Sequence, residues 1–263
     1  MLKNTIFLCP VCKHPLEENE KGFVCENSHN FDKAKQGYVN LLMSNKQSNH
    51  GDDKLMVEAR QTFLEKGYYS QMRECVNNIL GNNCVVLDAG CGEGYYTGVF
   101  SENNTVYGID ISKEALKRAS AKCKKASFAV ASIYDLPIAD QSVDAVVNIF
   151  SPDSRDEIIR VIKNGGRFIN VTPMENHLYE LKMAVYEKPY KNKYVNPERT
   201  GFIIKSQTEV KYKVLLESNT DIVSLFKMTP YYYNTSFKDT KKLDGYNNME
   251  VTLEFLITEY QKN

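Results

Sequence analysis

Four cysteine and histidine residues near the start of the chain have the spacing of a zinc-binding module. Two residues separate Cys9 from Cys12, and three residues separate Cys25 from His29. Thiolate and imidazole ligands arranged in two such pairs can close a tetrahedron around Zn²⁺. The segment between the pairs is short and polar, so metal binding would substitute for a core. Because no coordination position is left open, we expect a structural zinc. His14 is a competing ligand, but it follows Cys12 too closely to close the ring well.

A glycine-rich segment further along the chain has the composition of a nucleoside-binding loop. Gly90, Gly92 and Gly94 follow Asp88, which ends an apolar run. Glycine adopts positive φ and lets the backbone approach a ligand closely. Asp110 ends the next apolar run, where an acid is placed to accept both ribose hydroxyls. The spacing of the glycines differs from that of the dinucleotide-binding loop. These residues therefore predict a pocket for a nucleoside at the carboxyl ends of two strands.

This loop resembles that of class I S-adenosylmethionine-dependent methyltransferases. Their methyl donor is a sulfonium, so no phosphate-binding lysine is needed, and the loop has none. Ser132 and Tyr134 follow the third predicted strand, where the adenine would stack. In-line methyl transfer depends on proximity and alignment more than on acid–base groups.

The elements that must position these residues alternate between short β-branched runs and helical stretches. We predict strands over residues 85–87, 106–109, 128–130, 143–148 and 167–171, and helices over 95–101, 113–122 and 155–162. Residues 52–80 have helical spacing with an interruption at Gly67, and residues 249–260 alternate like an edge or near-edge strand. This order predicts an α/β fold in which helices cover both faces of a mostly parallel sheet.

Composition restricts the class of protein. The 263 residues contain 33 Lys and Arg against 33 Asp and Glu, so overall charge does not indicate a nucleic-acid partner. No apolar run is long enough to span a membrane. The N-terminal apolar stretch is too short for a signal peptide. The seven cysteines therefore suggest thiols and metal ligands, and we expect a cytoplasmic protein.

A stretch of basic and aromatic residues between positions 182 and 213 leaves two interpretations open. One is a solvated insertion. The other is an RNA-binding surface, in which cations contact phosphates and tyrosines stack on bases. The residues concerned are Lys182, Lys188, Lys191, Lys193, Arg199, Lys205, Lys211 and Lys213, with Tyr186, Tyr190, Tyr194 and Tyr212 among them.

Taken over nearly its full length, the chain resembles the bacterial 23S rRNA (guanine-N1)-methyltransferase family. The zinc-ligand pattern, the glycine-rich loop and the helical segment between them all take part. Further matching residues are Phe31-Asp32, residues 35–42, Gly51-Asp52, Met56, Ala59-Arg60, Phe63-Leu64, Gly67-Tyr68-Tyr69, residues 108–113, Leu136-Pro137, Thr172-Pro173, His177-Leu178 and residues 228–230. The segment 43–50 departs from relatives because it has one lysine where they carry a basic cluster.

The resemblance implies a seven-stranded, Rossmann-like methyltransferase domain at residues 83–263, a zinc module at 1–40 and a linking helical segment at 41–82. It implies structural zinc on Cys9, Cys12, Cys25 and His29. It also implies a homodimer whose cleft holds a 23S rRNA hairpin, with no membrane partner. The implied contacts to S-adenosylmethionine are Tyr69, Asp88, Gly90, Gly92, Glu93, Asp110 and His177.

Two other functions are alternatives for a chain with this fold. One is methylation of a small molecule, and the other is RNA binding without catalysis. Guanine N1 carries a proton, so its methylation needs a general base or stabilisation of the anion at O6. Asp153 and His177 are candidates for the base by their expected proximity to the pocket, and the sequence does not decide between them.

Overall fold

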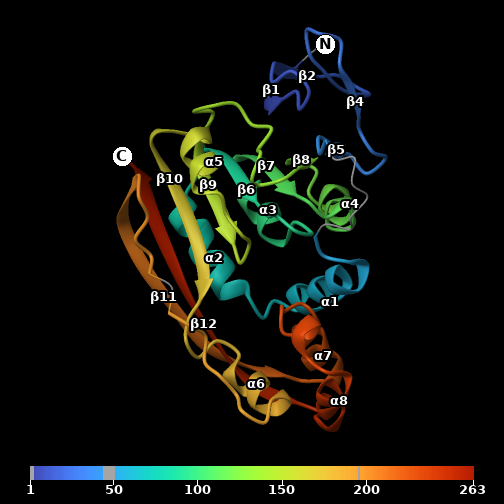
Figure 1. The fold of residues 1–263 in the computed structure, drawn as a ribbon, viewed down its shortest axis with the longest axis vertical. Helices are drawn as coiled ribbons and strands as arrows, with labels where there is room; N and C mark the ends of the chain where they lie inside the picture. Colours follow the sequence, from blue (N-terminus) through green and yellow to red (C-terminus); the bar gives the residue numbers. More distant parts are fainter. Residues whose placement is uncertain (1–2, 44–50, 195) are drawn as a thin grey trace.

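The computed structural model describes residues 3–43, 51–194 and 196–263. From residue 44 onward, the lysine-poor segment 43–50 lies outside the described residues. The N-terminal module forms an antiparallel sheet of β1 (Lys3–Leu8), β2 (Pro15–Glu18), β3 (Gly22–Val24) and β4 (Asn30–Asp32), which pair in that order. It lies at one end of the molecule (Figure 1).

The large sheet has the strand order β11-β12-β10-β9-β6-β7-β8-β5. Six strands from β10 to β5 pair in parallel, whereas β12 is antiparallel to both β10 and β11. The carboxyl ends of β6, β7 and β9 therefore meet at one edge of the sheet, where Asp88 and Asp110 lie. The strands are β5 (Val39–Asn40), β6 (Val85–Ala89), β7 (Thr105–Asp110), β8 (Ser127–Val130), β9 (Val143–Ile149), β10 (Ile162–Pro173), β11 (Phe202–Leu216) and β12 (Met249–Lys262).

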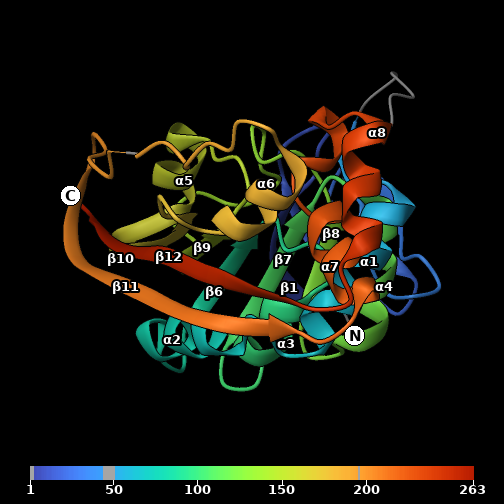
Figure 2. The ribbon, with the colours of Figure 1, turned by 90° about the horizontal axis from the view of Figure 1, so that it is seen from below.

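Helices cover both faces of this sheet, as predicted (Figure 2). Side chains of α2 and α3 pack with Val86 and Val147 on one face, and those of α5 pack with Leu87 and Val146 on the other. This alternation follows from the two-residue period of a strand. The helices are α1 (Lys54–Glu65), α2 (Ser70–Leu80), α3 (Tyr95–Phe100), α4 (Lys113–Lys122), α5 (Arg155–Val161), α6 (Tyr179–Val185), α7 (Asn219–Lys227) and α8 (Phe237–Thr240), with 3-10 turns η1 (Tyr232–Asn234) and η2 (Lys241–Gly245).

Two features of the sheet differ from the sequence prediction. The sheet has eight strands instead of seven, because Val39 and Asn40 of β5 pair with β8. The predicted boundary between the zinc module and the linking segment, at residue 40, would thus fall at the end of a strand of the large sheet. The strand β11 was not predicted, since its alternating polar and apolar residues follow a loop and carry many charges. It covers β12, which is therefore the near-edge strand of the two predicted alternatives.

The zinc module packs directly on the large sheet. Leu8 N donates to Pro137 O at 2.9 Å, and Ala139 N donates to Ile6 O at 2.9 Å. Phe7 is fully buried, and its ring meets that of Tyr107 in β7 edge-on with centroids 5.2 Å apart. The module and the large domain therefore share one hydrophobic core.

Several cations of the basic segment have partners within the protein. Lys182 is buried between the rings of Tyr190 and Tyr231, with its Nζ 4.5 and 4.8 Å from their centroids. Four further cations form ion pairs with carboxylates, namely Lys191 with Glu175, Arg199 with Asp153, Lys211 with Glu254 and Lys213 with Glu250. Part of the segment is β11, so it is not a wholly solvated insertion, and the RNA-binding interpretation stays a prediction. Among the described residues, no helix combines the length and apolarity required to cross a membrane.

Candidate zinc centre and cofactor pocket

The four predicted zinc ligands converge on one point. Their ligand atoms all lie within 4.8 Å of one another. His29 Nδ1 is 3.5 Å from Cys9 Sγ and 3.4 Å from Cys25 Sγ, and the sulfur atoms of Cys12 and Cys25 are 3.7 Å apart. Ligands about 2.0–2.3 Å from a tetrahedral zinc lie roughly 3.5–3.8 Å from each other. The donor set therefore fits Zn²⁺ in both chemistry and size.

The competing ligand His14 lies outside this cluster. Its Nδ1 is 3.0 Å from the backbone oxygen of Cys12, and its Nε2 forms an ion pair with Glu26 at 2.9 Å. Both ring nitrogens are thus engaged away from the four converging atoms. Of the two arrangements considered from the sequence, the geometry favours His29.

The glycine-rich loop connects β6 to α3 with three residues in left-handed backbone conformations. Gly90, Gly92 and Gly94 have φ values of 82°, 54° and 81°. A Cβ atom added to Gly90 would lie 2.2 Å from Ser151 Oγ, so the loop packs too closely for any side chain there. Asp110 fixes the loop from the neighbouring strand, because its Oδ2 accepts a hydrogen bond from Gly92 N at 2.9 Å.

Asp110 keeps acceptor capacity for a ligand. Its other oxygen accepts from Ser112 N at 2.8 Å. A carboxylate offers about four acceptor positions, so two remain for a vicinal diol such as that of ribose. Burial raises the pKa of Asp110, while these two backbone hydrogen bonds and the Arg60 guanidinium oppose that shift.

Asp88 is buried beneath the loop. It accepts a hydrogen bond from Thr97 Oγ1 at 2.6 Å. Burial raises its pKa to about 7; the Thr97 hydrogen bond opposes this shift, and the nearby Asp110 and Glu93 carboxylates add to it. The folded protein therefore holds a proton on Asp88 between about pH 4 and pH 7, where an unfolded chain does not.

Because the folded protein holds this proton, we predict that its stability falls as pH rises. The native state binds more protons than the unfolded state over that interval, so the contribution of Asp88 to stability falls as pH rises towards 7. We therefore compare the free energy of unfolding of Asp88→Asn with that of the unmodified protein. As pH rises from 5 to 8, this difference should shift by about 2–3 kcal/mol in favour of the variant, at 1.4 kcal/mol per pH unit between the two pKa values. Urea unfolding at both pH values tests this; an equal difference at pH 5 and pH 8 contradicts it.

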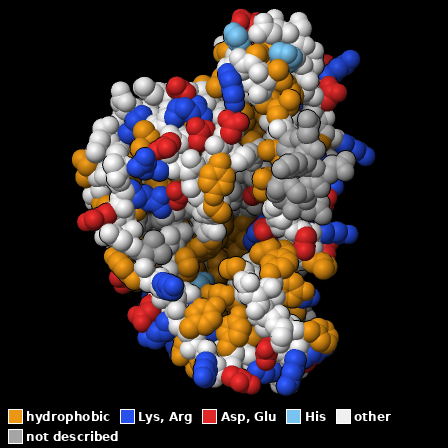
Figure 3. Space-filling view, viewed as in Figure 1, with side chains coloured by type: hydrophobic (Ala, Val, Ile, Leu, Met, Phe, Trp, Pro, Cys, Tyr) orange, Lys and Arg blue, Asp and Glu red, His pale blue; other side chains and the backbone are white. Residues whose placement is uncertain are grey.

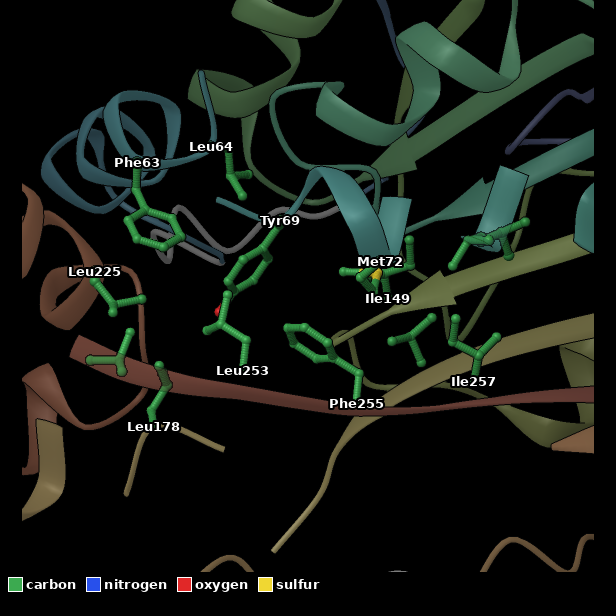
Figure 4. Close-up of a cluster of buried hydrophobic side chains, with 14 of the residues drawn as sticks. Phe63, Leu64, Tyr69, Met72, Ile149, Leu178, Leu225, Leu253, Phe255 and Ile257 are labelled. Atoms are coloured by element: carbon green, nitrogen blue, oxygen red, sulfur yellow. The ribbon is translucent and has the colours of Figure 1, made fainter. Parts of the chain in front are cut away.

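An aromatic group adjoins the loop at the ends of β9 and β10. Tyr69 lies between Phe63 and Phe255, with ring centroids 5.2 and 5.1 Å away (Figure 4). His177 is 4.7 Å from Phe255, and Phe150 lies beside both Tyr69 and His177. Tyr69 stands at the start of α2 without capping it through its side chain, so its ring serves this cluster instead.

His177 has a defined protonation state. Glu254 N donates to its Nδ1 at 3.2 Å, which leaves the proton of the neutral ring on Nε2, 3.4 Å from Tyr69 Oη. Burial, helped by Lys182, lowers the pKa of His177 to about 3. Its one lone pair is therefore occupied at neutral pH.

The other residues predicted to surround the pocket take varied positions. Glu93 is buried and accepts from Arg60 Nε at 2.6 Å. Ser132 Oγ accepts from Tyr134 N in the turn after β8, and the Tyr134 side chain is mostly exposed. In Figure 3 the surface is hollowed between the sheet and the α7–α8 region, and hydrophobic side chains line the hollow.

Arg60 was not among the site residues predicted from the sequence, although it faces this site. Val57, Phe63 and Leu64 are its buried neighbours three or four residues away on α1. A charged residue at that spacing lies on the apolar side of the helix. This pattern was the available signal that Arg60 has a buried partner.

Known protein families match both the N-terminal module and the large domain. Residues 7–49 match the zinc-ribbon family described as RlmA, N-terminal, and residues 80–224 match a methyltransferase domain family. The chain is 37% identical over 197 residues to the 23S rRNA (guanine(748)-N(1))-methyltransferase of Streptomyces fradiae, covering 70% of each chain. This protein belongs to the 23S rRNA (guanine-N1)-methyltransferase family.

A second relative is similar to this protein over most of its length. The chain is 26% identical over 269 residues to YxjB of Bacillus subtilis (strain 168), a provisionally assigned 23S rRNA (guanine-N(1)-)-methyltransferase, covering 95% of each chain. Among solved structures, the YcgJ protein of Bacillus subtilis has a TM-score of 0.52 at 15% identity, covering 74% of this chain and 99% of that one. This likeness shows the class I methyltransferase fold. As a member of the guanine-N1 family, the chain is an S-adenosylmethionine-dependent methyltransferase with a structural zinc.

Proposed function

We propose that this protein methylates N1 of a guanine in a hairpin of 23S rRNA. The observation that carries the proposal is the match to a guanine-N1 enzyme over 70% of both chains, together with an intact loop from Asp88 to Gly94. The zinc module supports it too, because it belongs to the same family of rRNA enzymes. A small-molecule enzyme would not require that module.

The site residues have distinct proposed roles. Cys9, Cys12, Cys25 and His29 would hold zinc. Asp110 would accept the ribose hydroxyls, since it keeps two acceptor positions beside Gly92. Gly90, Gly92 and Glu93 would line the pocket, Asp88 would hold the loop through Thr97, and Tyr69 and His177 would border the methionine portion. When bound, S-adenosylmethionine supplies an electrophilic methyl group. These residues would bind the rest of the cofactor and so orient that group.

Neither candidate base is free to remove the guanine N1 proton. His177 is neutral with its lone pair bound to Glu254 N. Asp153 forms an ion pair with Arg199 at 2.8 Å, and that guanidinium lies over the rings of Phe168 and Tyr260. We infer that the protein favours methylation by holding the base in position and that the proton leaves to another acceptor.

The assembly and the location of the protein are also proposals. We propose a homodimer whose two chains together hold the rRNA hairpin, as the family resemblance implies. Because ribosomal RNA is the proposed substrate, we also propose a cytoplasmic location.

The deciding experiment is methyl transfer to unmodified 23S rRNA with labelled S-adenosylmethionine, followed by nucleoside mass spectrometry. The proposal requires 1-methylguanosine. Cofactor binding without any methylated nucleoside would show that the substrate is wrong.

We also propose that Phe150 stacks on the target base. It follows β9 with φ of 57°, an unusual conformation for a bulky residue, and its side chain is 42% exposed beside buried Tyr69 and His177. Stacking on an aromatic ring contributes about 1–3 kcal/mol per base. We therefore expect Phe150→Ala to lower kcat/KM for the hairpin about 10- to 100-fold while changing cofactor affinity little. Phe150→Tyr, which keeps the ring, is the matched control; equal losses in both variants contradict stacking.

A further inference from the structure

Arg60 is a buried cation held by two acids. It lies on α1, where its Nε donates to Glu93 at 2.6 Å and its Nη1 pairs with Asp52. Burial lowers the pKa of an arginine, but both carboxylates raise that of Arg60 well beyond its ordinary value, so it stays charged. The side chain is therefore fixed in orientation as well as in charge.

The third nitrogen of this guanidinium, Nη2, is buried. Among the described residues, none accepts a hydrogen bond from Nη2. A buried donor left unpaired costs about 1–3 kcal/mol, so such a group in a site indicates a ligand atom.

The guanidinium lies against the glycine-rich loop. A Cβ atom added to Gly92 would lie 3.1 Å from Nη2 and 3.5 Å from Cζ of Arg60. The Gly92 N–H points to Asp110, the proposed ribose acceptor. Nη2 thus lies at the pocket, next to the position expected for the nucleoside.

The charges of the pocket complement those of S-adenosylmethionine. The surrounding acids Asp52, Glu93 and Asp110 suit the ammonium and sulfonium groups. A guanidinium donates only, and the one anion of this cofactor is its α-carboxylate. We propose that Arg60 Nη2 binds the α-carboxylate of S-adenosylmethionine, with Glu93 and Asp52 holding the guanidinium in place. This inference rests on the proposed cofactor pocket and not on the RNA substrate.

The test compares S-adenosylmethionine with decarboxylated S-adenosylmethionine, which lacks only the carboxylate, by calorimetry without RNA. The unmodified protein should bind the complete cofactor roughly 10- to 100-fold more tightly, as for one or two charge-assisted hydrogen bonds. Arg60→Gln should reduce this preference to about threefold or less. Arg118→Gln is the matched control, because Arg118 also pairs with α1, through Glu58, outside the loop.

A second variant covers the case in which Arg60→Gln unfolds. Arg60→Lys keeps a cation for Glu93 but has a single nitrogen in place of a fork, so the preference should also shrink. The proposal is overturned if a folded Arg60 variant keeps the full preference or weakens both ligands equally. Because RNA is absent, this outcome does not depend on methyl transfer to rRNA.

Discussion

Replacing Asp110 with alanine is expected to weaken binding of S-adenosylmethionine about 100-fold or more. The carboxylate has two acceptor positions left for the ribose hydroxyls, and a hydrogen bond to a charged group is worth about 1.5–3 kcal/mol. Two such bonds correspond to about 3 kcal/mol or more, or two decades of affinity. The substitution also removes the acceptor for Gly92 N and so loosens the loop. Calorimetric titration with S-adenosylmethionine in the absence of RNA measures the loss directly.

Two variants separate binding from folding in this experiment. Asp110→Asn keeps an acceptor oxygen for one backbone N–H but loses the charge, so it should retain part of the fold and little of the affinity. Asp140→Ala removes an exposed carboxylate paired with Arg160 and should leave cofactor affinity unchanged. Affinity within threefold of the unmodified protein in folded Asp110→Ala would contradict the ribose role.

Removing zinc is expected to unfold the N-terminal module and to destabilise the domain beneath it. Structural zinc in small finger modules contributes about 10–16 kcal/mol of apparent binding free energy, which is comparable to the whole stability of a domain. The strands of the module are three to six residues long, and Phe7 of the module packs against Tyr107 of the large sheet. Cys25→Ser should therefore abolish zinc binding, lower Tm and expose amides of β1–β4 to hydrogen exchange.

A cysteine outside the cluster provides the matched control for zinc. Cys84 lies just before β6 with a partly exposed thiol, so Cys84→Ser should keep zinc and the exchange protection of β1–β4. Chelation of the unmodified protein should reproduce the effect of Cys25→Ser. If the zinc-free protein kept slowly exchanging amides in β1–β4, packing on β7 alone would hold the module, and zinc would be dispensable for its fold.

The features that the sequence predicted correctly depend on local patterns. Helices α1 to α5 and the parallel strands β6 to β10 were predicted within a few residues, because apolar spacing and glycine turns act over short distances. The spacing of the cysteine and histidine residues also picked out four side chains whose ligand atoms converge, and the glycines picked out the loop between β6 and α3. The contacts of that loop with a nucleoside stay a prediction.

The sequence by itself thus determined the fold class, the residues available to bind zinc and the position of the glycine-rich loop. Only the tertiary structure decided that β5 joins the large sheet, that Phe7 packs on Tyr107 and that Arg60 faces Gly92. It also decided that both candidate bases are engaged, His177 by Glu254 N and Asp153 by Arg199. Each of these contacts joins residues more than 30 positions apart. Local periodicity shows that a side chain is buried, but its partner depends on which distant elements pack together.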